Sequence, residues 1–235
     1  MIKDNIISIL IEIKKNKLAF ASLIFIIIAA IVSILGYWLT PDKTPYANSQ
    51  YLEISNQYPG FRCSFLKIKK NEAIYNKNIF YTMLFGRVSE YKYIPIEDYF
   101  FSNDSLYYKE YGGDIKKINV VDVVYSLKNS TINKKGNRFI FYDVKGGLIE
   151  ESLENIKQQI VRDNIVKKAF WLGTDKYGRD MLSQLIIGTR VSLSVGLISV
   201  LISLLIGVPL GAIAGYYRGK ADSVIMWLVN VVWSI

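Results

Sequence analysis

The feature that most constrains this chain is an uncharged run of 27 residues from Val191 to Tyr217. At about 1.5 Å of rise per residue, a helix of this length measures about 40 Å, which exceeds the roughly 30 Å hydrocarbon thickness of a bilayer. A run this long and this apolar is typical of a membrane span. We therefore predict a transmembrane helix at 191–217.

Small residues recur inside this run at every fourth position. They are Ser199, Ser203, Gly207, Gly211 and Gly215. Residues four apart share one helix face, and small side chains let a second helix backbone approach closely within a membrane. Small residues are also simply common in membrane helices, but the regular glycine spacing favours packing over chance. We predict a helix-packing stripe, with the three glycines at the closest contact.

A second uncharged run covers 22 residues, 18–39. At about 33 Å of helix it is long enough to cross a bilayer, and it exceeds the roughly 7–15 apolar residues of a signal-peptide core. Tyr37 and Trp38 mark its exit, and such amphipathic aromatic residues are enriched at membrane interfaces. We predict a retained transmembrane helix at 18–39.

Residues 1–17 orient this first span. Apolar residues at helical spacing, Ile6, Ile7, Leu10 and Ile11, predict a small amphipathic helix on the membrane surface. The segment also carries four lysines against two acidic residues. Because short cytoplasmic segments carry an excess of positive charge, the N-terminus is predicted to lie in the cytoplasm.

The composition excludes several classes of function. Histidine is absent from all 235 residues, which rules out a Ser-His-Asp triad and the commonest zinc and iron sites. Cys63 is alone, so neither an internal disulfide nor a cysteine metal cluster can form, and burial as a small apolar residue is favoured over reactivity. The net charge is +9, but the cations are interspersed with 15 acidic residues between Pro41 and Phe170. We expect no cofactor, no metal and no nucleic-acid partner.

Residues 41–170 are polar and long enough to bury a modest core. Alternating or β-branched sequence predicts strands at Phe61–Phe65, Asn119–Leu127 and Arg138–Val144, the last entering a hairpin turn at 145–148. Ser152 can cap a helix that continues to about Lys168. The fold class predicted is therefore an α-helical membrane protein with a small α+β extracytoplasmic domain inserted after the first span.

Residues 171–190 contain the sequence LGTDKYGRD. Gly173 and Gly178 predict a tight turn, Thr174 or Asp175 can cap the helix that follows, and Asp180 can favour its positive end. Met181–Arg190 is predicted as a short helix at the membrane interface. A structural turn is favoured over a catalytic site, because no base or nucleophile with an orienting partner is present.

A short charged turn is predicted beyond the second span, at 218–223. It contains Arg218, Gly219, Lys220 and Asp222. Its two cations indicate the cytoplasmic side. This agrees with the orientation of the first span, because a chain that starts in the cytoplasm returns to it after two crossings. Residues 224–235 begin a third apolar run of 12 residues, or about 18 Å of helix, which is shorter than a bilayer. We expect a third transmembrane helix that is cut short.

The C-terminal third resembles the permease subunits of peptide-importing ABC transporters, the dipeptide, oligopeptide and nickel group. The resemblance is carried by LGTDKYGRDMLSQLIIGTRVSL and by AGYYRGKAD. Its motif residues in this chain are Leu172, Gly173, Thr174, Asp175, Gly178, Arg179, Asp180, Gly188 and Arg190. Gln184 stands where the family usually has Arg, Lys220 where it usually has Gly, and Trp227 where Arg is common. The first span and the large insertion also resemble, more weakly, the subgroup that imports longer peptides and microcins.

This resemblance implies a multi-pass protein of the bacterial cytoplasmic (inner) membrane. Its expected partners are a second permease subunit, two cytoplasmic ATPase subunits, an extracytoplasmic solute-binding protein and the lipid bilayer. The resemblance implies a transport subunit and not an enzyme. Because the sequence has no phosphate-binding loop of the GxxxxGK[ST] kind, ATP binding is expected on partner chains. The remaining spans and the coupling helix of the family are not in the sequence, so we expect an incomplete, N-terminal part of a permease.

A second hypothesis is a two-span membrane anchor that displays an extracytoplasmic binding or sensory domain. The size of 41–170 favours it, whereas the LGTD and AGY segments, which an anchor does not need, favour the permease. A membrane hydrolase has no supporting motif. The identity of the transported solute is left open by the sequence.

Overall fold

The computed structural model describes residues 14–72, 78–127 and 132–234. The amphipathic helix predicted at 1–17 therefore lies mostly outside the described residues. The chain divides into two compact units, Met1–Gly188 and Thr189–Ile235, and each is described by itself.

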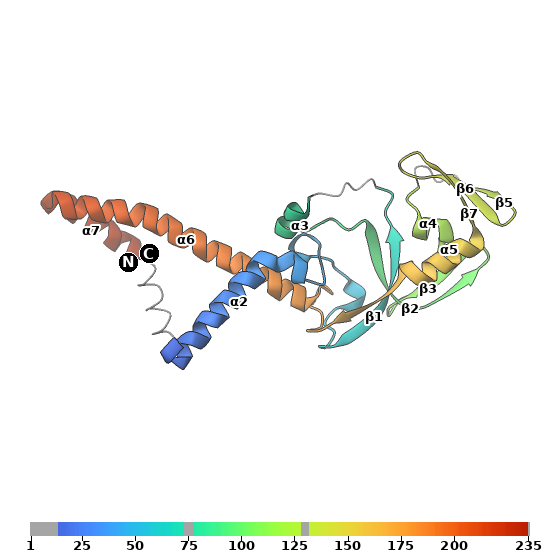
Figure 1. Ribbon diagram of the computed structural model, residues 1–235, viewed down its shortest axis with the longest axis horizontal. Coiled ribbons are helices and arrows are strands. Elements are labelled where there is room, and N and C mark those ends of the chain that lie inside the picture. Colours follow the sequence, from blue (N-terminus) through green and yellow to red (C-terminus); the bar gives the residue numbers. More distant parts are fainter. Residues whose placement is uncertain (1–13, 73–77, 128–131, 235) are drawn as a thin grey trace. The chain divides into compact units, whose positions relative to one another are not determined.

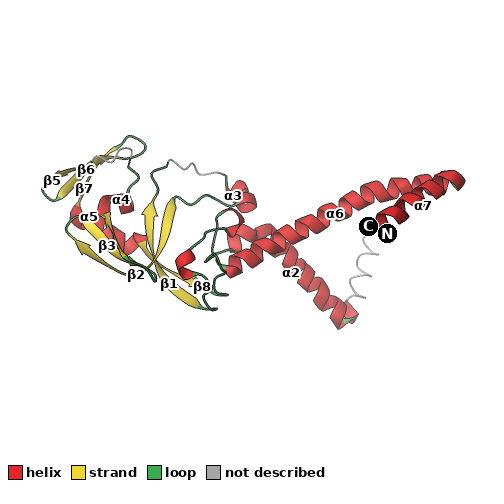
Figure 2. Cartoon of the chain, turned by 180° about the vertical axis from the view of Figure 1, so that it is seen from behind, coloured by secondary structure: helices red, strands yellow, loops and turns green. Residues whose placement is uncertain are grey.

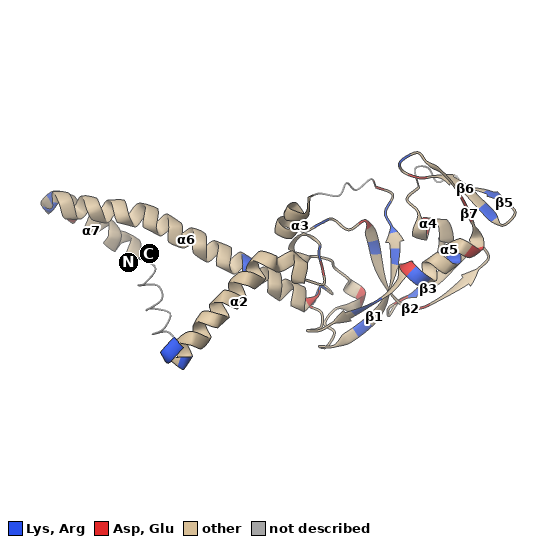
Figure 3. Cartoon of the chain, viewed as in Figure 1, with Lys and Arg blue, Asp and Glu red and all other residues tan. Residues whose placement is uncertain are grey.

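The first predicted span forms helix α2, Lys17–Leu39. Asn16 caps it, because its side-chain oxygen accepts hydrogen bonds from the backbone N–H groups of Leu18 and Ala19 at 3.1 and 3.3 Å. Figure 3 shows no charged residue along the body of the helix. Most of its large apolar side chains are exposed, so its surroundings must supply the apolar contacts that the protein does not.

An antiparallel five-stranded sheet lies within 61–170, a stretch that we call the α+β region (Figure 2). Its strand order is β4-β3-β2-β1-β8. The strands are β1 Phe61–Lys69, β2 Tyr91–Ser102, β3 Ser105–Glu110, β4 Ile115–Asn119 and β8 Ile165–Phe170. The strand predicted at Phe61–Phe65 is confirmed. Because Phe61 pairs with Phe170, the region begins and ends at the same edge of the sheet.

A smaller sheet holds the predicted hairpin. It consists of β5 Asn133–Lys135, β6 Arg138–Tyr142 and β7 Leu148–Ser152. In the turn between β6 and β7, the Asp143 carboxylate accepts a hydrogen bond from the Gly147 N–H at 2.6 Å, and Gly146 has a φ of +86°. The hairpin prediction is confirmed, since glycine supplies the positive φ that the turn requires.

The strand predicted at Asn119–Leu127 is wrong, because Val120–Val124 form helix α4. The Asn119 side chain accepts a hydrogen bond from the Val121 N–H at 3.0 Å and starts the helix. All four valines of the turn are buried in the main core. Core packing on one short turn therefore outweighs the strand preference of β-branched residues.

The helix predicted from Ser152 to about Lys168 ends earlier. Its start is confirmed, since the Ser152 hydroxyl accepts from the Asn155 N–H at 3.2 Å, but α5 covers only Leu153–Gln159. A π-helical turn follows, η3 Ile160–Asn164. The buried Asn164 side chain donates to the carbonyls of Lys67 and Val123 at 2.6 and 3.2 Å, which fixes the chain beside β1. Strand pairing with β1 then replaces the helix.

The main core lies where the two sheets meet the short helices, with α4 and α5 packed between β1 and β7 (Figure 1). Its fully buried members include Leu66, Leu106, Val121, Phe139, Phe141 and Ile156. A second cluster forms on the opposite face of β1 and β8. It contains Tyr51, Ile54, Phe61, Cys63, Phe65 and Phe170.

Two short 3-10 turns, η1 Pro45–Ala47 and η2 Leu52–Ile54, connect α2 to β1. Helix α3, Ile79–Phe85, lies between β1 and β2 and packs against α2. Helix α6, Met181–Tyr217, is continuous, so the separate interfacial helix predicted at Met181–Arg190 is wrong. Helix α7, Gly219–Trp233, begins inside the predicted turn at 218–223 and reduces that turn to Arg218.

Among the described residues, two helices are long and apolar enough to cross a membrane, α2 and α6. Helix α7 has 15 residues. In the second unit, a β-carbon placed at Gly207, Gly211 or Gly215 would meet no other atom within 4 Å. Their packing against another helix stays a prediction.

We predict that Leu106→Ala destabilises the α+β region much more than Leu148→Ala. Leu106 on β3 is fully buried, whereas Leu148 on β7 is 62% exposed. A buried Leu→Ala change typically costs about 2–5 kcal/mol, because it removes apolar contacts and leaves a cavity. Urea unfolding of the full chain in detergent, followed by tyrosine and tryptophan fluorescence, measures the difference. Equal losses in the two variants would contradict the assigned core.

Candidate functional site

The LGTD segment forms a loop that is hydrogen-bonded to residues 51–57. The buried Thr174 is central to this contact: its N–H donates to the Gln57 carbonyl at 3.1 Å, and its hydroxyl accepts from the Gln57 N–H at 2.9 Å. The same hydroxyl donates to the Ile54 carbonyl at 2.5 Å. One threonine thus makes three bonds with a segment about 120 residues away, two of them to the backbone of Gln57.

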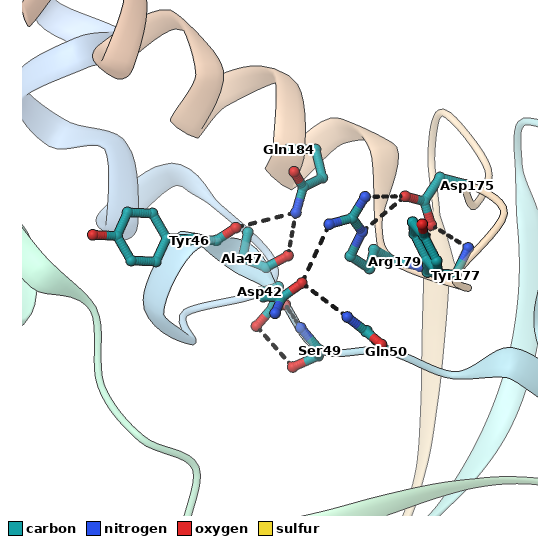
Figure 4. A network of polar contacts seen from close by, with 10 residues as sticks. Asp42, Tyr46, Ala47, Ser49, Gln50, Asp175, Tyr177, Arg179 and Gln184 are labelled. Carbon is teal, nitrogen blue, oxygen red and sulfur yellow. Dashed lines mark hydrogen bonds and ion pairs between the residues drawn. The ribbon is translucent and has the colours of Figure 1, made fainter.

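Asp175 and Arg179 hold the turn of the loop closed (Figure 4). One carboxylate oxygen of Asp175 accepts from the backbone N–H groups of Tyr177 and Arg179, both at 2.9 Å. The other faces the Arg179 guanidinium at 2.6 Å. Partial burial works against ionisation, but the hydrogen bonds from Arg179 and Tyr177 outweigh it and keep the pKa of Asp175 below its usual value. The guanidinium also donates to the Asn48 side chain at 3.2 Å.

Gly173 and Gly178 are required by both conformation and space. Their φ angles are +76° and +70°, which L side chains adopt at a cost. A β-carbon at Gly173 would overlap the Gln57 carbonyl, and one at Gly178 would overlap the Tyr51 carbonyl. The tight turn predicted at these glycines is confirmed.

Asp180, rather than Thr174 or Asp175, caps helix α6. Its carboxylate accepts from the backbone N–H of Ser183 at 3.0 Å and from the Ser183 hydroxyl. The Ser183 hydroxyl in turn accepts from the Asp42 N–H at 3.0 Å. The cap prediction for Thr174 or Asp175 is wrong, because the loop uses both residues to bind itself and residues 51–57.

The other wall of the site is the loop after α2, which the sequence did not single out. Asp42 accepts hydrogen bonds from the N–H and hydroxyl groups of Thr44 and Ser49, at 2.8–3.2 Å. Gln184 on α6 donates to the carbonyls of Tyr46 and Ala47 at 3.1 and 2.6 Å (Figure 4). An aspartate two residues before a threonine, next to a proline, is a turn signal that could have located this loop.

A cavity of about 460 Å³ opens beside this loop. Its lining includes Asp42, Tyr51, Arg87, Tyr93 and Lys168. A smaller cavity of about 190 Å³ shares Asp42, Tyr51 and Lys168 and reaches Asp180, whose second carboxylate oxygen is buried without a hydrogen-bond partner in the described structure. The two cavities therefore combine an ammonium donor with carboxylate acceptors, a set that can hold water or a small polar group.

Lys168 is the most perturbed cation of the site. Its ammonium lies 3.6 Å from the Tyr93 ring centroid and 3.3 Å from the Tyr51 hydroxyl. Burial lowers its pKa to about 8, because lost hydration outweighs the attraction of Asp42 and Asp180. The alternation Val166, Lys168, Phe170 along β8 is the sequence signal that Lys168 faces inward with its apolar neighbours.

Cys63 is buried, and burial raises the pKa of its thiol to about 11, so its predicted role as a small apolar residue is supported. Among the described residues, no group of three acidic or cysteine side chains could hold a metal ion.

The predicted motif residues fall into two sets. The loop brings together Gly173, Thr174, Asp175, Gly178, Arg179 and Asp180, with Leu172 partly exposed at its start. Gly188 lies further along α6, at the end of the first unit. The predicted residues of the second unit are Arg190, the stripe from Ser199 to Gly215, and the charged group at 218–222.

Residues 8–59 match the family model described as the N-terminal TM domain of oligopeptide transport permease C. This match contains α2 and the segment that receives the LGTD loop. The α+β region lies outside it.

Known proteins with permease names are similar to part of the chain. The glutathione transport system permease protein GsiD of Pectobacterium atrosepticum is 48% identical over 66 residues, 28% of this chain and 22% of the relative. The dipeptide permease DppC of Bacillus subtilis is 38% identical over 81 residues, 34% of this chain and 25% of the relative. The oligopeptide permease OppC of the same organism is 34% identical over 73 residues, which are 31% of this chain and 24% of the relative.

These matches are all to membrane-spanning permeases of transport systems. More particularly, the predicted resemblance to the peptide-importing group is confirmed. The chain spans about a quarter of the length of the curated relatives it matches. No solved structure matches it.

We predict that Gly178→Ala destabilises the site more than Gly112→Ala destabilises its own turn. Both glycines have positive φ, +70° and +64°, so both variants carry about 1–2 kcal/mol of backbone strain. A β-carbon at Gly112 meets open space, whereas one at Gly178 displaces the Tyr51 carbonyl and weakens the bond from the Tyr51 N–H to the Tyr177 carbonyl. Faster trypsin cleavage at Lys176 in Gly178→Ala alone is expected. Similar cleavage rates in both variants would contradict this contact.

Replacing Lys168 by Met is predicted to change how stability depends on pH. The folded pKa of Lys168, about 8, lies below the ordinary value of 10.5, so the unfolded chain binds more protons between these values. The native chain should therefore gain stability relative to Lys168→Met as pH rises, by about 1 kcal/mol between pH 7 and 9. Urea unfolding of both full chains measures this. Cys63 and the buried tyrosines titrate in both proteins and cancel. A constant difference would contradict the buried ammonium.

Proposed function

We propose that the chain is a membrane-spanning part of an ATP-driven importer of peptides or similar small solutes. The observation that carries the proposal is the contact between the segment matched by the family model and the LGTD loop. Residues 51–57 of that segment hold Thr174, Asp175 and Tyr177 by backbone hydrogen bonds. The two stretches with permease resemblance thus form one structure, although the α+β region separates them in sequence.

In this role α2 and α6 contribute to the wall of a translocation path. A second permease subunit completes the path, two cytoplasmic ATPase subunits drive it, and an extracytoplasmic solute-binding protein delivers the solute. The names of the relatives mention dipeptides, oligopeptides and glutathione, and they support a short peptide as the solute. The small-residue stripe on α6 suits contact with a neighbouring helix of the assembly.

The proposed topology follows the charges near the span ends. Lys14 and Lys15 precede α2 and Lys17 is its first residue, and Arg218 and Lys220 follow α6, which favours the cytoplasm for both ends. The α+β region then lies outside the cytoplasmic (inner) membrane of a bacterium, between the two crossings.

The alternative function is a two-span anchor that displays the α+β region as a binding module. The cavity of about 460 Å³ at Lys168 favours this alternative, because it is lined by polar side chains and lies outside the spans. Ligand binding to the chain without any ATPase partner would support it.

Assembly and transport test the proposal together. We expect the tagged chain to copurify with a second permease subunit and ATPase subunits from the same cells, and peptide uptake by the cells to require it. Cells that lack the chain but express the other subunits are the control. Failure to copurify, together with uptake that does not change when the chain is omitted, would overturn the importer assignment.

Cysteine labelling tests the topology. In a Cys63→Ala background, a membrane-impermeant maleimide added to intact spheroplasts should label Lys145→Cys, which lies in an exposed hairpin, but not Lys220→Cys. Lys220→Cys should react after permeabilisation. The reverse pattern would invert the orientation and contradict the proposal.

A further inference from the structure

Helix α3 is apolar on all sides and has no buried residue. Its exposed large side chains are Ile79 63%, Phe80 74%, Tyr81 40%, Leu84 43% and Phe85 57%, and Val88 beyond its end is 57% exposed. A helix of seven residues is too short to be stable alone in water, and one that is apolar all round needs apolar surroundings. The α+β region does not provide them, and α2, which packs against α3, leaves most of the large α3 side chains exposed.

The end of α3 is fixed at the point where α2 ends. Gly86, with φ +73°, ends the helix, and a β-carbon there would approach the Tyr37 ring to 2.8 Å and the Lys43 carbonyl to 2.9 Å. The Arg87 N–H donates to the same carbonyl at 2.9 Å. Helices α2 and α3 pack against each other within the first unit (Figure 1). The position of α3 along α2 is therefore set by close backbone contacts.

This position corresponds to a membrane interface if α2 crosses the bilayer. The last turn of α2 carries Trp38, a residue type that is enriched where acyl chains meet headgroups, and Trp38 is 54% exposed. Tyr81 and Phe85 of α3 add two further rings, with centroids 4.9 Å apart. Lys43 and Arg87 are exposed beside the end of α3 and can face lipid phosphates.

We propose that α3, with Val88, inserts into the lipid interface at the end of α2 and anchors the α+β region to the membrane surface. Lipid fits better than a protein groove, because the apolar side chains surround the helix instead of forming one face. Trp38 and Leu39 at the end of α2, the helix that packs against α3, are exposed apolar residues as well. The proposal rests on the proposed function only in taking α2 as a membrane span.

The test places an environment-sensitive fluorophore, NBD, on single cysteines of the full chain reconstituted alone into phosphatidylcholine–phosphatidylglycerol vesicles. The background is Cys63→Ala. The variants are Phe80→Cys on α3, Ile26→Cys on α2, and Leu148→Cys on β7; the native residues are exposed to similar extents, 74%, 62% and 62%. Circular dichroism verifies that each variant is folded.

Lipids that carry a doxyl quencher near the headgroup should quench the Phe80→Cys probe several-fold more than the Leu148→Cys probe. Quenching of Phe80→Cys no stronger than that of Leu148→Cys, while deep doxyl lipids quench Ile26→Cys, would overturn the anchor and leave the span intact. A blue-shifted but unquenched Phe80→Cys probe would indicate a protein contact instead and would also overturn it. Failure to quench Ile26→Cys would contradict the span itself, and with it both proposals.

Discussion

The structure of the first unit depends on the bonds that Thr174 makes with Ile54 and Gln57. The bond to Ile54 is buried and the bond from the Gln57 N–H is partly buried, so breaking the first would leave polar groups without partners at about 1–3 kcal/mol. They join the segment that follows the first span to the segment that precedes α6. Because they hold the two ends of the α+β region together, that region can fold between them without disturbing the membrane segments.

The surroundings of Lys168 show a balance between stability and the capacity to bind. Burying an ammonium costs free energy, and three aromatic rings recover part of it by facing the cation. Asp180 caps α6 with one oxygen and leaves the other unpaired beside the cavity. A protein under selection for stability alone would more simply use an apolar side chain at position 168. The presence of Lys168 and Asp180 beside the cavities fits a hydrated or ligand-binding interior.

Sequence patterns predicted the features that arise from local chemistry. Long apolar runs identified α2 and α6, and glycines marked the loop before α6, because span length and positive φ are properties of short segments. The four valines of α4 and the strand β8 were misassigned, since their conformations are set by packing against β1 and by the side chain of Asn164, which is distant in sequence. Asp42, Gln184 and Lys168 were missed for the same reason: their partners belong to other segments.

The pairing of Phe61 with Phe170 has an evolutionary consequence. A segment of about 110 residues enters and leaves its host at neighbouring strand positions. Its gain, loss or exchange would require repair of one short junction, and the permease-like frame on either side would keep its contacts. Proteins that differ greatly in length between these two strand positions can therefore share the same frame.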